Sequence, residues 1–392
     1  MKILVVCQYY HPEPFRITDI CETLKAKGHQ VTVLTGLPNY PQGRVLAEYR
    51  FGRKRKETLN GVEILRCFLV GRGKNRVGLL LNYVSFALSA SLKALFLRRD
   101  FDVVFAYQLS PVLMCLPAMV YKRRFKKKMV LYCLDLWPAS LTAGGIKESS
   151  IVFKVFLSIS KWIYNSADTL LVSSGMFKEY FLDILGIKSA NIIHLPQYAE
   201  EVFKSSQVVK KAKEGFTFMF AGNVGDMQSV ETIIKAANEL RENKNISFQI
   251  IGDGSRLAQC KKLASELDVK NILFLGRRPV EEMPMYYEKA DAMLVTLKND
   301  KYLSYTLPGK VQSYLAAGKP IVGAINGETA RVIEEAGCGY CCKAEDYKEL
   351  AAIILMFSNS NEKLKMAQAA REMYQKEYRK EQFMQILENA FV

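Results

Sequence analysis

The segment with the clearest chemical signal reads YTLPGKVQSYLAAGKP and spans residues 305–320. Pro308 and Gly309 predict a turn that opens a short helix, which places Lys310 in the first helical turn. The N–H groups of a helix start carry partial positive charge, so they repel a cation and attract an anion. A lysine here therefore indicates an anion, such as a phosphate group, bound beside the helix start. A solvated surface lysine is the alternative.

Glycine-rich loops follow three expected strands in the second half of the chain. Glycine permits positive φ angles and lets backbone N–H groups approach an anion closely. One such loop alone would fit an ordinary strand-to-helix turn, but three of them favour a phosphorylated ligand. The residues are Gly222, Asn223 and Gly225 in the first loop, Gly252 and Gly254 in the second, and Gly276 and Arg277 in the third.

Several common catalytic motifs are absent from the sequence. No G-x-G-x-x-G follows the first expected strand, and no G-x-x-x-x-G-K-[ST], H-E-x-x-H or G-x-S-x-G occurs. Dinucleotide binding, P-loop chemistry and zinc proteolysis are therefore disfavoured. Only His11, His29 and His194 could provide imidazole chemistry. The cysteines within 338–342 could hold a metal or a disulfide, but a strand end of small residues is favoured because no second ligand pair follows.

Short apolar runs rich in β-branched residues alternate with segments of helical periodicity. This alternation predicts parallel sheets covered by helices on both faces. The polar stretch 199–214 indicates a join between two α/β domains, 1–198 and 199–392, and the last helix (about 375–392) is expected to pack back on the first. Ligands of such sheets bind at the carboxyl ends of the strands. Expected strands are 3–7, 31–34, 62–65, 102–106, 129–133, 169–173 and 191–195, then 216–222, 246–252, 271–276, 291–295, 320–324 and 338–342.

The positive charge of the chain is concentrated in its first half. The net charge is +16; residues 1–198 carry 28 Lys and Arg against 13 Asp and Glu, whereas residues 199–392 carry 27 against 26. The first half is therefore expected to meet an anionic partner. No nucleic acid is expected, because no helix-turn-helix, zinc-finger or RNA-binding signature accompanies the basic clusters. These clusters are 50–56, 71–76, 98–99 and 122–128.

The apolar run VGLLLNYVSFALSASLKALFL at 77–97 is long enough to be considered as a membrane span. Asn82, the serines and Lys93 argue against a span. An amphipathic helix on an anionic membrane surface fits better, and a buried core helix flanked by solvated basic loops is the alternative. No signal peptide precedes the first strand and the nine cysteines are scattered, so the chain is expected in the reducing cytosol.

Five longer motifs are typical of one family when they occur together. They are YYHPEPFRITDICETLKAKGHQVTVLTGLPNYPQG (9–43), DLWPASL (135–141), AGNVGDMQSVETIIKAA (221–237), IIGDGSR (250–256) and LPGKVQSYLAAGKPIV (307–322). With them, essentially the whole chain resembles the family-4 retaining glycosyltransferases. Within that family it is similar to bacterial amino-sugar transferases of O-antigen, capsule and colanic-acid assembly. The resemblance implies the α/β GT-B fold, in which two doubly wound Rossmann-like domains face an interdomain cleft.

The resemblance also implies a reaction. The C-terminal domain would bind a nucleotide-diphosphate sugar, and the N-terminal domain an acceptor on a polyprenyl-diphosphate carrier at the inner face of the bacterial plasma membrane. We therefore expect a hexosyl- or acetamidohexosyl-transferase that moves a sugar, in particular a 2-acetamido sugar, from a UDP-sugar to a lipid-linked glycan of a surface polysaccharide. No metal or other cofactor is expected. The partners would be the donor, the acceptor, the anionic membrane surface and other polysaccharide-assembly proteins.

The donor site implied by the resemblance needs positive charge, because negative charge develops on the leaving nucleoside diphosphate. Many relatives carry an Arg and a Lys at the positions that read Asn223 and Gln228 here. We therefore expect Lys310, together with the N–H groups at Gly309, to supply the charge, with Arg277 as a helper. Pro308 would complete the phosphate-binding helix start.

Two residues of the first half are candidates for a catalytic role. Asp135 follows an expected strand at a position where relatives often carry a histidine near the sugar. It could orient the acceptor hydroxyl or the donor sugar, and partial burial would raise its pKa; capping the next helix is the alternative. Arg16 could bind the phosphates of donor or acceptor as a fork-shaped donor, or be a solvated residue of a first helical turn.

Three departures from the family pattern bear on activity. The paired glutamates of the family fall on Tyr305 and Ser313, so a serine hydroxyl replaces the carboxylate that usually holds the ribose. Relatives usually carry an acid at Ala139 and a serine at Gly309. A catalytically weakened GT-B protein that binds a glycan or a partner at the membrane is therefore an alternative. A non-hydrolysing UDP-sugar 2-epimerase is a third reading.

Overall fold

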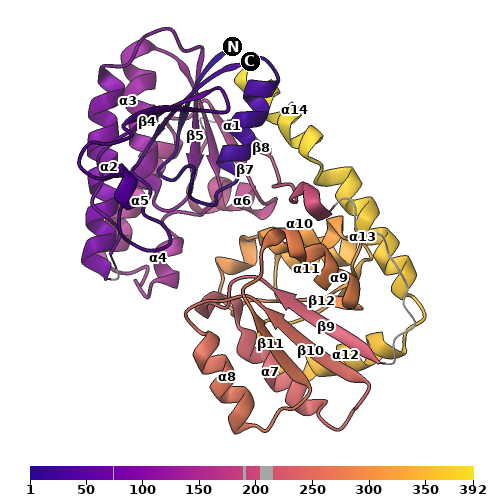
Figure 1. Cartoon of the computed structure of the whole chain (residues 1–392). Coiled ribbons are helices and arrows are strands. Elements are labelled where there is room, and N and C mark those ends of the chain that lie inside the picture. The colour runs from indigo at the N-terminus through magenta and orange to yellow at the C-terminus, as the bar shows by residue number, and fades with distance from the viewer. Residues whose placement is uncertain (74, 189–190, 204–214) are drawn as a thin grey trace. The chain divides into compact units, whose positions relative to one another are not determined.

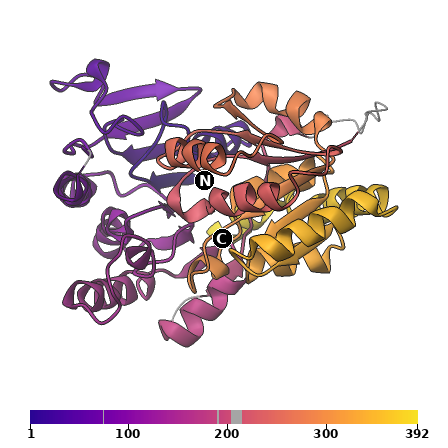
Figure 2. The same cartoon turned by 90° about the horizontal axis from the view of Figure 1, so that it is seen from below.

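The computed structural model describes residues 1–73, 75–188, 191–203 and 215–392, so Lys74 and most of the expected join, 204–214, lie outside the described residues. The chain forms two compact units, which are described separately. Unit 1 comprises Met1–Ser173, Phe177–Leu195 and Met384–Val392, and unit 2 comprises Ser174–Met176 and Pro196–Phe383. In each unit, helices lie on both faces of a sheet (Figures 1 and 2).

The described part of unit 1 contains an eight-stranded sheet of order β3-β4-β2-β1-β5-β6-β7-β8. Neighbouring strands are parallel except β3 and β4. The central strands are almost entirely buried, as is usual where helices cover both faces. The strands are β1 (Lys2–Val6), β2 (Gln30–Thr35), β3 (Lys56–Leu59), β4 (Val62–Arg66), β5 (Val103–Gln108), β6 (Lys128–Cys133), β7 (Thr169–Val172) and β8 (Asn191–His194).

The helices within residues 1–198 follow the apolar periodicity of the sequence. In α1, the buried residues Ile17, Ile20, Cys21 and Leu24 recur at helical spacing, which gives the helix one face for the sheet. The chain then turns at Gly28, where φ is +91°. The helices are α1 (Ile17–Ala26), α2 (Arg76–Leu95), α3 (Leu116–Phe125), α4 (Ser140–Ala143), α5 (Ile151–Tyr164) and α6 (Met176–Glu179).

Helix α2 is long and apolar enough over Val77–Leu95 to cross a membrane by length and composition, and 28% of that window is buried. One of its faces is part of the core of unit 1. Asn82 is fully buried there: its side chain donates to the Val70 carbonyl (2.6 Å) and accepts from Gln8 Nε2 (2.7 Å). The helix is therefore held in unit 1 by buried polar contacts as well as by apolar packing.

The described part of unit 2 contains a six-stranded sheet of order β11-β10-β9-β12-β13-β14, and all of its pairs are parallel. All six strands expected in the second half are confirmed. The cysteine-rich segment forms the last one, as expected. The strands are β9 (Phe216–Ala221), β10 (Ile246–Ile251), β11 (Ile272–Gly276), β12 (Ala292–Thr296), β13 (Ile321–Ala324) and β14 (Gly339–Cys342).

Two apolar clusters hold the helices of unit 2 to its sheet. One includes residues of α7, α8 and α12, and the other includes residues of α9, α10 and α11. These clusters fix α10, which carries the lysine singled out in the sequence. The helices are α7 (Val230–Glu239), α8 (Leu257–Glu266), α9 (Met283–Lys289), α10 (Gly309–Ala316), α11 (Glu328–Glu335), α12 (Tyr347–Asn359), α13 (Lys363–Glu377) and α14 (Lys380–Phe391).

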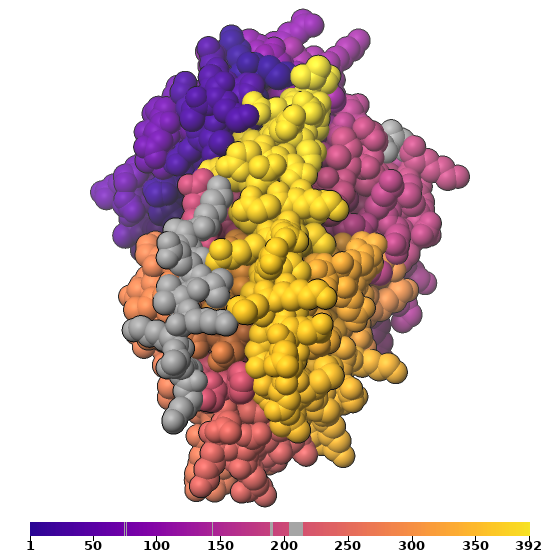
Figure 3. Space-filling model, turned by 90° about the vertical axis from the view of Figure 1, so that its right-hand side faces the viewer, coloured from indigo at the N-terminus to yellow at the C-terminus, as the bar shows by residue number. Residues whose placement is uncertain are grey.

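The last two helices form the surface coloured yellow in Figure 3. The first residues of α14 belong to unit 2, where the Phe383 ring lies 4.9 Å from that of Tyr198. From Met384 onward the helix belongs to unit 1, where Phe391 packs 5.5 Å from Phe105. Helix α14 thus supplies apolar side chains to the cores of both units.

Candidate functional site

Three loops meet at the carboxyl edge of the sheet in unit 2. The Gly222 N–H donates to the carbonyl of Ile251, and the Gly252 N–H donates to the carbonyl of Gly276, both at 2.9 Å. Gly254 belongs to the second loop, and a Cβ there would lie 2.4 Å from the Val224 carbonyl oxygen of the first loop. The structure thus brings together the glycine-rich loops that the sequence singled out.

The glycines of these loops are required by close backbone packing. Gly222 and Gly252 have φ of +139° and +144°, which L side chains rarely adopt. A Cβ at Gly252 would lie 1.8 Å from the Gly222 carbonyl oxygen, whereas a Cβ at Gly222 would lie 3.2 Å from Cε and Nζ of Lys310. The first loop therefore lies directly against the ammonium group of Lys310.

An amide pair fixes the first loop. The Asn223 side chain donates to Gln228 Oε1 at 3.0 Å, and the Gly225 N–H donates to the same oxygen at 3.1 Å. The Gln228 carbonyl accepts from the Thr296 hydroxyl at 2.6 Å. The two positions that lack the cations of many relatives thus shape the loop by neutral hydrogen bonds.

Lys310 lies in the first turn of α10, which starts at Gly309 after Pro308. The residue as a whole is partly exposed, but Nζ is buried and has no hydrogen-bond partner among the residues that the structure describes. The nitrogen lies 3.6 Å from the centroid of the Phe220 ring. Burial lowers the pKa of Lys310 to about 7. Because burial of an unpaired charge is unfavourable and one ring face offsets it only in part, a bound acceptor would stabilise the charged form of this side chain.

Ser313 lies one turn further along α10 and is almost fully buried. Its hydroxyl donates to Glu200 Oε2 at 3.0 Å. The serine that replaces the carboxylate of relatives therefore has a carboxylate beside it, supplied by another segment. Sequence analysis missed Glu200 because it belongs to a polar stretch without periodicity.

Gly309 and Arg277 are exposed. A Cβ at Gly309 would meet no heavy atom within 4 Å, so the serine of relatives would fit there. Arg277 follows β11 directly. The expected helper role of Arg277 stays a prediction.

Asp135 follows β6 at the carboxyl edge of the sheet in unit 1. Its carboxylate accepts from the hydroxyls of Ser110 and Ser140, and the Trp137 indole donates to Ser110 Oγ at 2.9 Å. Burial raises the pKa of Asp135, as expected from the sequence, although the hydroxyl hydrogen bonds oppose the rise. The capping alternative is wrong, since Ala139 occupies the N-cap position of α4.

The two serines that hold Asp135 were missed by sequence analysis. Ser110 follows β5, the neighbour of β6, and Ser140 is the first residue of α4. A hydroxyl just after the adjacent strand was a signal that could have identified Ser110. The network gives the carboxylate one fixed orientation, which a group that positions a substrate hydroxyl requires.

Arg16 precedes α1 and is partly buried. Burial raises the pKa values of Tyr107 on β5 and Tyr132 on β6, and the positive charge of Arg16 opposes both rises. Arg16 therefore lies close to the strand that precedes Asp135.

Glu13 is a buried acid that sequence analysis did not single out. Its carboxylate accepts from the backbone N–H groups of Asn39 (2.9 Å), Tyr40 (2.7 Å) and Tyr10 (3.2 Å). Burial raises its pKa to about 7, although the three N–H donors oppose the rise. Glu13 joins the loops that follow β1 and β2, and so fixes the segment that leads to Arg16.

Both halves of the chain match known family models. Residues 15–197 match the model described as glycosyl transferase 4-like domain, and residues 201–373 match the model described as glycosyl transferases group 1. A curated relative, the probable glycosyltransferase WbjE of Pseudomonas aeruginosa, is 30% identical over 307 residues, which are 74% of each chain. The putative colanic acid biosynthesis glycosyl transferase WcaI of Escherichia coli K12 is 26% identical over 90% of this chain and 91% of that protein.

A solved structure shares the fold over nearly the whole chain. Anabaena HepE in complex with UDP covers 99% of this chain, and 99% of HepE is covered, with a TM-score of 0.72 and 15% identity. A likeness at this identity supports the fold, which contains two Rossmann-like sheets, and no residue role.

Proposed function

Since the chain belongs to the family-4 glycosyltransferases of GT-B fold, we propose that it transfers a sugar from a UDP-sugar to a lipid-linked glycan in surface polysaccharide biosynthesis. The name of the relative WcaI, which refers to colanic acid, supports the polysaccharide context. The UDP complex of HepE supports a UDP donor. We further propose a retaining transfer, a 2-acetamido sugar and an acceptor on a polyprenyl diphosphate.

The observation that supports this proposal most directly is the buried ammonium group of Lys310, which lies beside Gly222 and has no hydrogen-bond partner among the described residues. A diphosphate at the start of α10 would accept from Lys310 Nζ and from nearby backbone N–H groups. Its negative charge would also offset the repulsion between the ammonium group and the positive end of the helix dipole. As the donor bond breaks, charge grows on the leaving phosphate, and this ammonium group would stabilise it without a metal ion.

The other candidates would orient the sugar and the acceptor. Ser313 lies within the same helix as Lys310 and, together with Glu200, would present a hydroxyl and a carboxylate to the ribose. In unit 1, the fixed carboxylate of Asp135 would orient a hydroxyl of acceptor or donor. Arg16 would bind a phosphate group.

Turnover with a panel of donors tests the reaction. The protein is incubated with a mixture of UDP- and GDP-sugars, with and without a membrane lipid extract, and the products are identified by mass spectrometry. We expect release of UDP from one UDP-sugar and a lipid product that gains that sugar. Interconversion of donors without an acceptor would identify an epimerase instead. The absence of turnover with every donor would favour a glycan- or partner-binding protein.

We also propose that the protein acts at the anionic inner face of the plasma membrane. In α2, apolar side chains recur every three or four residues on the face opposite the core, and they are exposed. They are Val77, Leu80, Leu81, Val84, Leu88 and Leu92, with Phe96 directly after the helix. In α5, Trp162 is half exposed and the Arg123 guanidinium lies 4.9 Å from its ring. Exposed apolar side chains with basic neighbours are typical of helices that lie on anionic membranes.

A further inference from the structure

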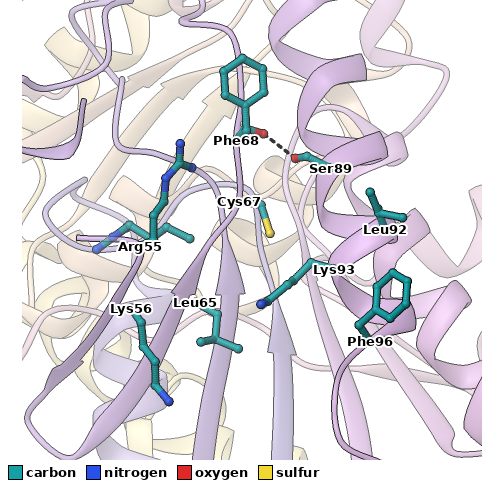
Figure 4. A pocket seen from close by; sticks show the side chains of 10 residues that line it. Arg55, Lys56, Leu65, Cys67, Phe68, Ser89, Leu92, Lys93 and Phe96 are labelled. Atoms are coloured by element: carbon teal, nitrogen blue, oxygen red, sulfur yellow. Dashed lines mark hydrogen bonds between the residues drawn. The ribbon is translucent and has the colours of Figure 1, made fainter. Parts of the chain in front are cut away.

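A groove of about 480 Å³ lies in unit 1 between the outer strands β3 and β4 and the second half of α2 (Figure 4). It is separate from every residue considered for donor binding or catalysis. Its lining combines apolar side chains with basic ones, and the two kinds come from different elements. Such a lining is better suited to an amphipathic anion than to a simple inorganic ion or an uncharged hydrocarbon.

The apolar part of the groove continues the exposed stripe of α2. Leu92 and Phe96 are 60% and 78% exposed, and Phe68, at 55%, lies across from them after β4. The Ser89 hydroxyl donates to the Phe68 carbonyl, which ties this segment to α2 (Figure 4). Leu65 also lines the groove. A hydrocarbon chain that entered from the α2 surface would therefore cover side chains that are now in contact with water.

The basic part has two cations available for a ligand. Arg55 and Lys93 have no acidic partner in the described part of the chain, and Figure 4 shows Lys93 reaching from α2 toward Leu65. Both charges are close enough to the Cys67 thiol to oppose the rise of its pKa on burial. By contrast, Arg66 is committed to Glu57 at 2.5 Å.

We propose that this groove binds one phosphorylated lipid molecule from the membrane surface, with its phosphate between Arg55 and Lys93 and its hydrocarbon chain along Leu92 and Phe96. The charge complementarity selects an anionic headgroup. Continuity with the exposed face of α2 selects a ligand that is already in a membrane. This inference rests on the proposed membrane association. It adds to that association a specific site that binds one lipid molecule per chain.

Calorimetric titration of the full chain with dodecyl phosphate, below its critical micelle concentration, tests the site. Inorganic phosphate and dodecyl maltoside serve as the two half-ligands. We expect one dodecyl phosphate per chain and at least tenfold weaker binding of either half-ligand. Equally tight binding of inorganic phosphate would overturn the proposal in favour of a simple anion site. Binding of dodecyl maltoside as tight as that of dodecyl phosphate would overturn the role of the cations.

Variants assign the binding to the groove. The double variant Arg55→Ala/Lys93→Ala should weaken dodecyl phosphate binding at least tenfold, and Leu92→Ser/Phe96→Ser should do so as well. Arg99→Ala/Lys188→Ala removes the same charge from exposed positions outside the groove and should bind like the unmodified chain. Thermal unfolding checks that each variant is folded. Unchanged affinity in both groove variants would overturn the proposal.

Vesicle flotation separates this proposal from the one on which it rests. If the unmodified chain floats with phosphatidylglycerol vesicles but both groove variants bind dodecyl phosphate normally, only the groove is refuted. If the chain neither floats nor binds dodecyl phosphate, the membrane association is refuted as well.

Discussion

The side chain of Lys310 is expected to contribute to the affinity for the donor. Its ammonium group is buried without an acceptor in the described residues, so a bound diphosphate would gain a charge-assisted hydrogen bond. Lys310→Ala should weaken UDP binding by about 1.5–3 kcal/mol, roughly tenfold to 150-fold. Calorimetry measures this change, and Lys348→Ala, at an exposed position of α12, is the matched control. Equal UDP affinity in the Lys310 variant would rule out the contact.

The low pKa of Lys310 predicts a pH dependence of donor binding. In the free protein its pKa is lowered to about 7, and a bound diphosphate would raise it again. Between the free and the bound pKa, binding takes up a proton, so affinity falls as pH rises above about 7 and is constant below it. Between pH 7.5 and 9, the affinity for a UDP-sugar should fall by up to about tenfold per pH unit.

The Lys310→Arg variant is the control for this pH dependence. Arginine stays protonated across the range, so its binding of a UDP-sugar should not change between pH 7.5 and 9. The diphosphate diester of a UDP-sugar does not titrate there. A flat profile for the unmodified chain would mean that the ammonium group does not contact the diphosphate.

Ser313 shows how a neighbouring residue changes the expected effect of a mutation. The family pattern alone suggests that Ser313→Glu would tighten nucleotide binding. In the structure, the Glu200 carboxylate lies 3.0 Å from the Ser313 hydroxyl, so a second carboxylate would meet a like charge. We therefore expect no gain in UDP affinity from Ser313→Glu, but a gain in Glu200→Gln/Ser313→Glu relative to Glu200→Gln. Tighter binding by the single variant would contradict this account.

At the scale of elements, strands dominated by apolar side chains were readily predicted, whereas the polar edge strand β3 was not. All seven strands expected in the first half and all six in the second are present, and apolar side chains dominate the sequence of each. β3 was missed: it is the antiparallel edge of the sheet, its side chains alternate between exposed and partly exposed, and it follows a basic cluster. Apolarity, the signal used for the other strands, is absent there.

The candidate site was only partly predictable, for a related reason. Lys310 and the glycine loops lie just after strands or at a helix start, so local sequence places them. Glu200, Ser110 and Ser140 matter through contacts with residues that are distant in sequence or in another loop. No periodicity or spacing specifies such pairs.

Helix α2 is anchored by one polar residue, which predicts a stability effect. Asn82 is fully buried and its amide joins Gln8, Asn39 and the Val70 carbonyl. Asn82→Ala would remove the side-chain donor of the Val70 carbonyl and one hydrogen bond each from Gln8 and Asn39, so it should lower the free energy of unfolding by about 1–3 kcal/mol. Leu80→Ala, at an exposed position of the same helix, should change it by less than about 0.5 kcal/mol. Urea denaturation followed by circular dichroism measures both; equal effects would show that the amide network does not anchor the helix.

At the scale of the whole molecule, charge and exposed apolar surface occur in the same half of the chain. Residues 1–198 carry 15 more basic than acidic residues, and the same residues contain the exposed faces of α2 and α5. Residues 199–392 are nearly neutral and contain the loops around Lys310. This asymmetry agrees with the proposal that the first half meets an anionic surface and the second half binds a soluble anionic ligand.

Flotation with vesicles tests this division. The chain should float with vesicles that contain phosphatidylglycerol and should bind less as salt rises from 0.05 to about 0.5 M, because salt screens the basic side chains. Leu88→Ser/Leu92→Ser should reduce flotation at every salt concentration, since it removes apolar contact with the membrane. Thr169→Ser within β7 changes a buried position of the same unit and should leave flotation unchanged. Equal binding to purely phosphatidylcholine vesicles would refute the electrostatic part of the attraction, and unchanged flotation of the leucine variant would refute the role of α2.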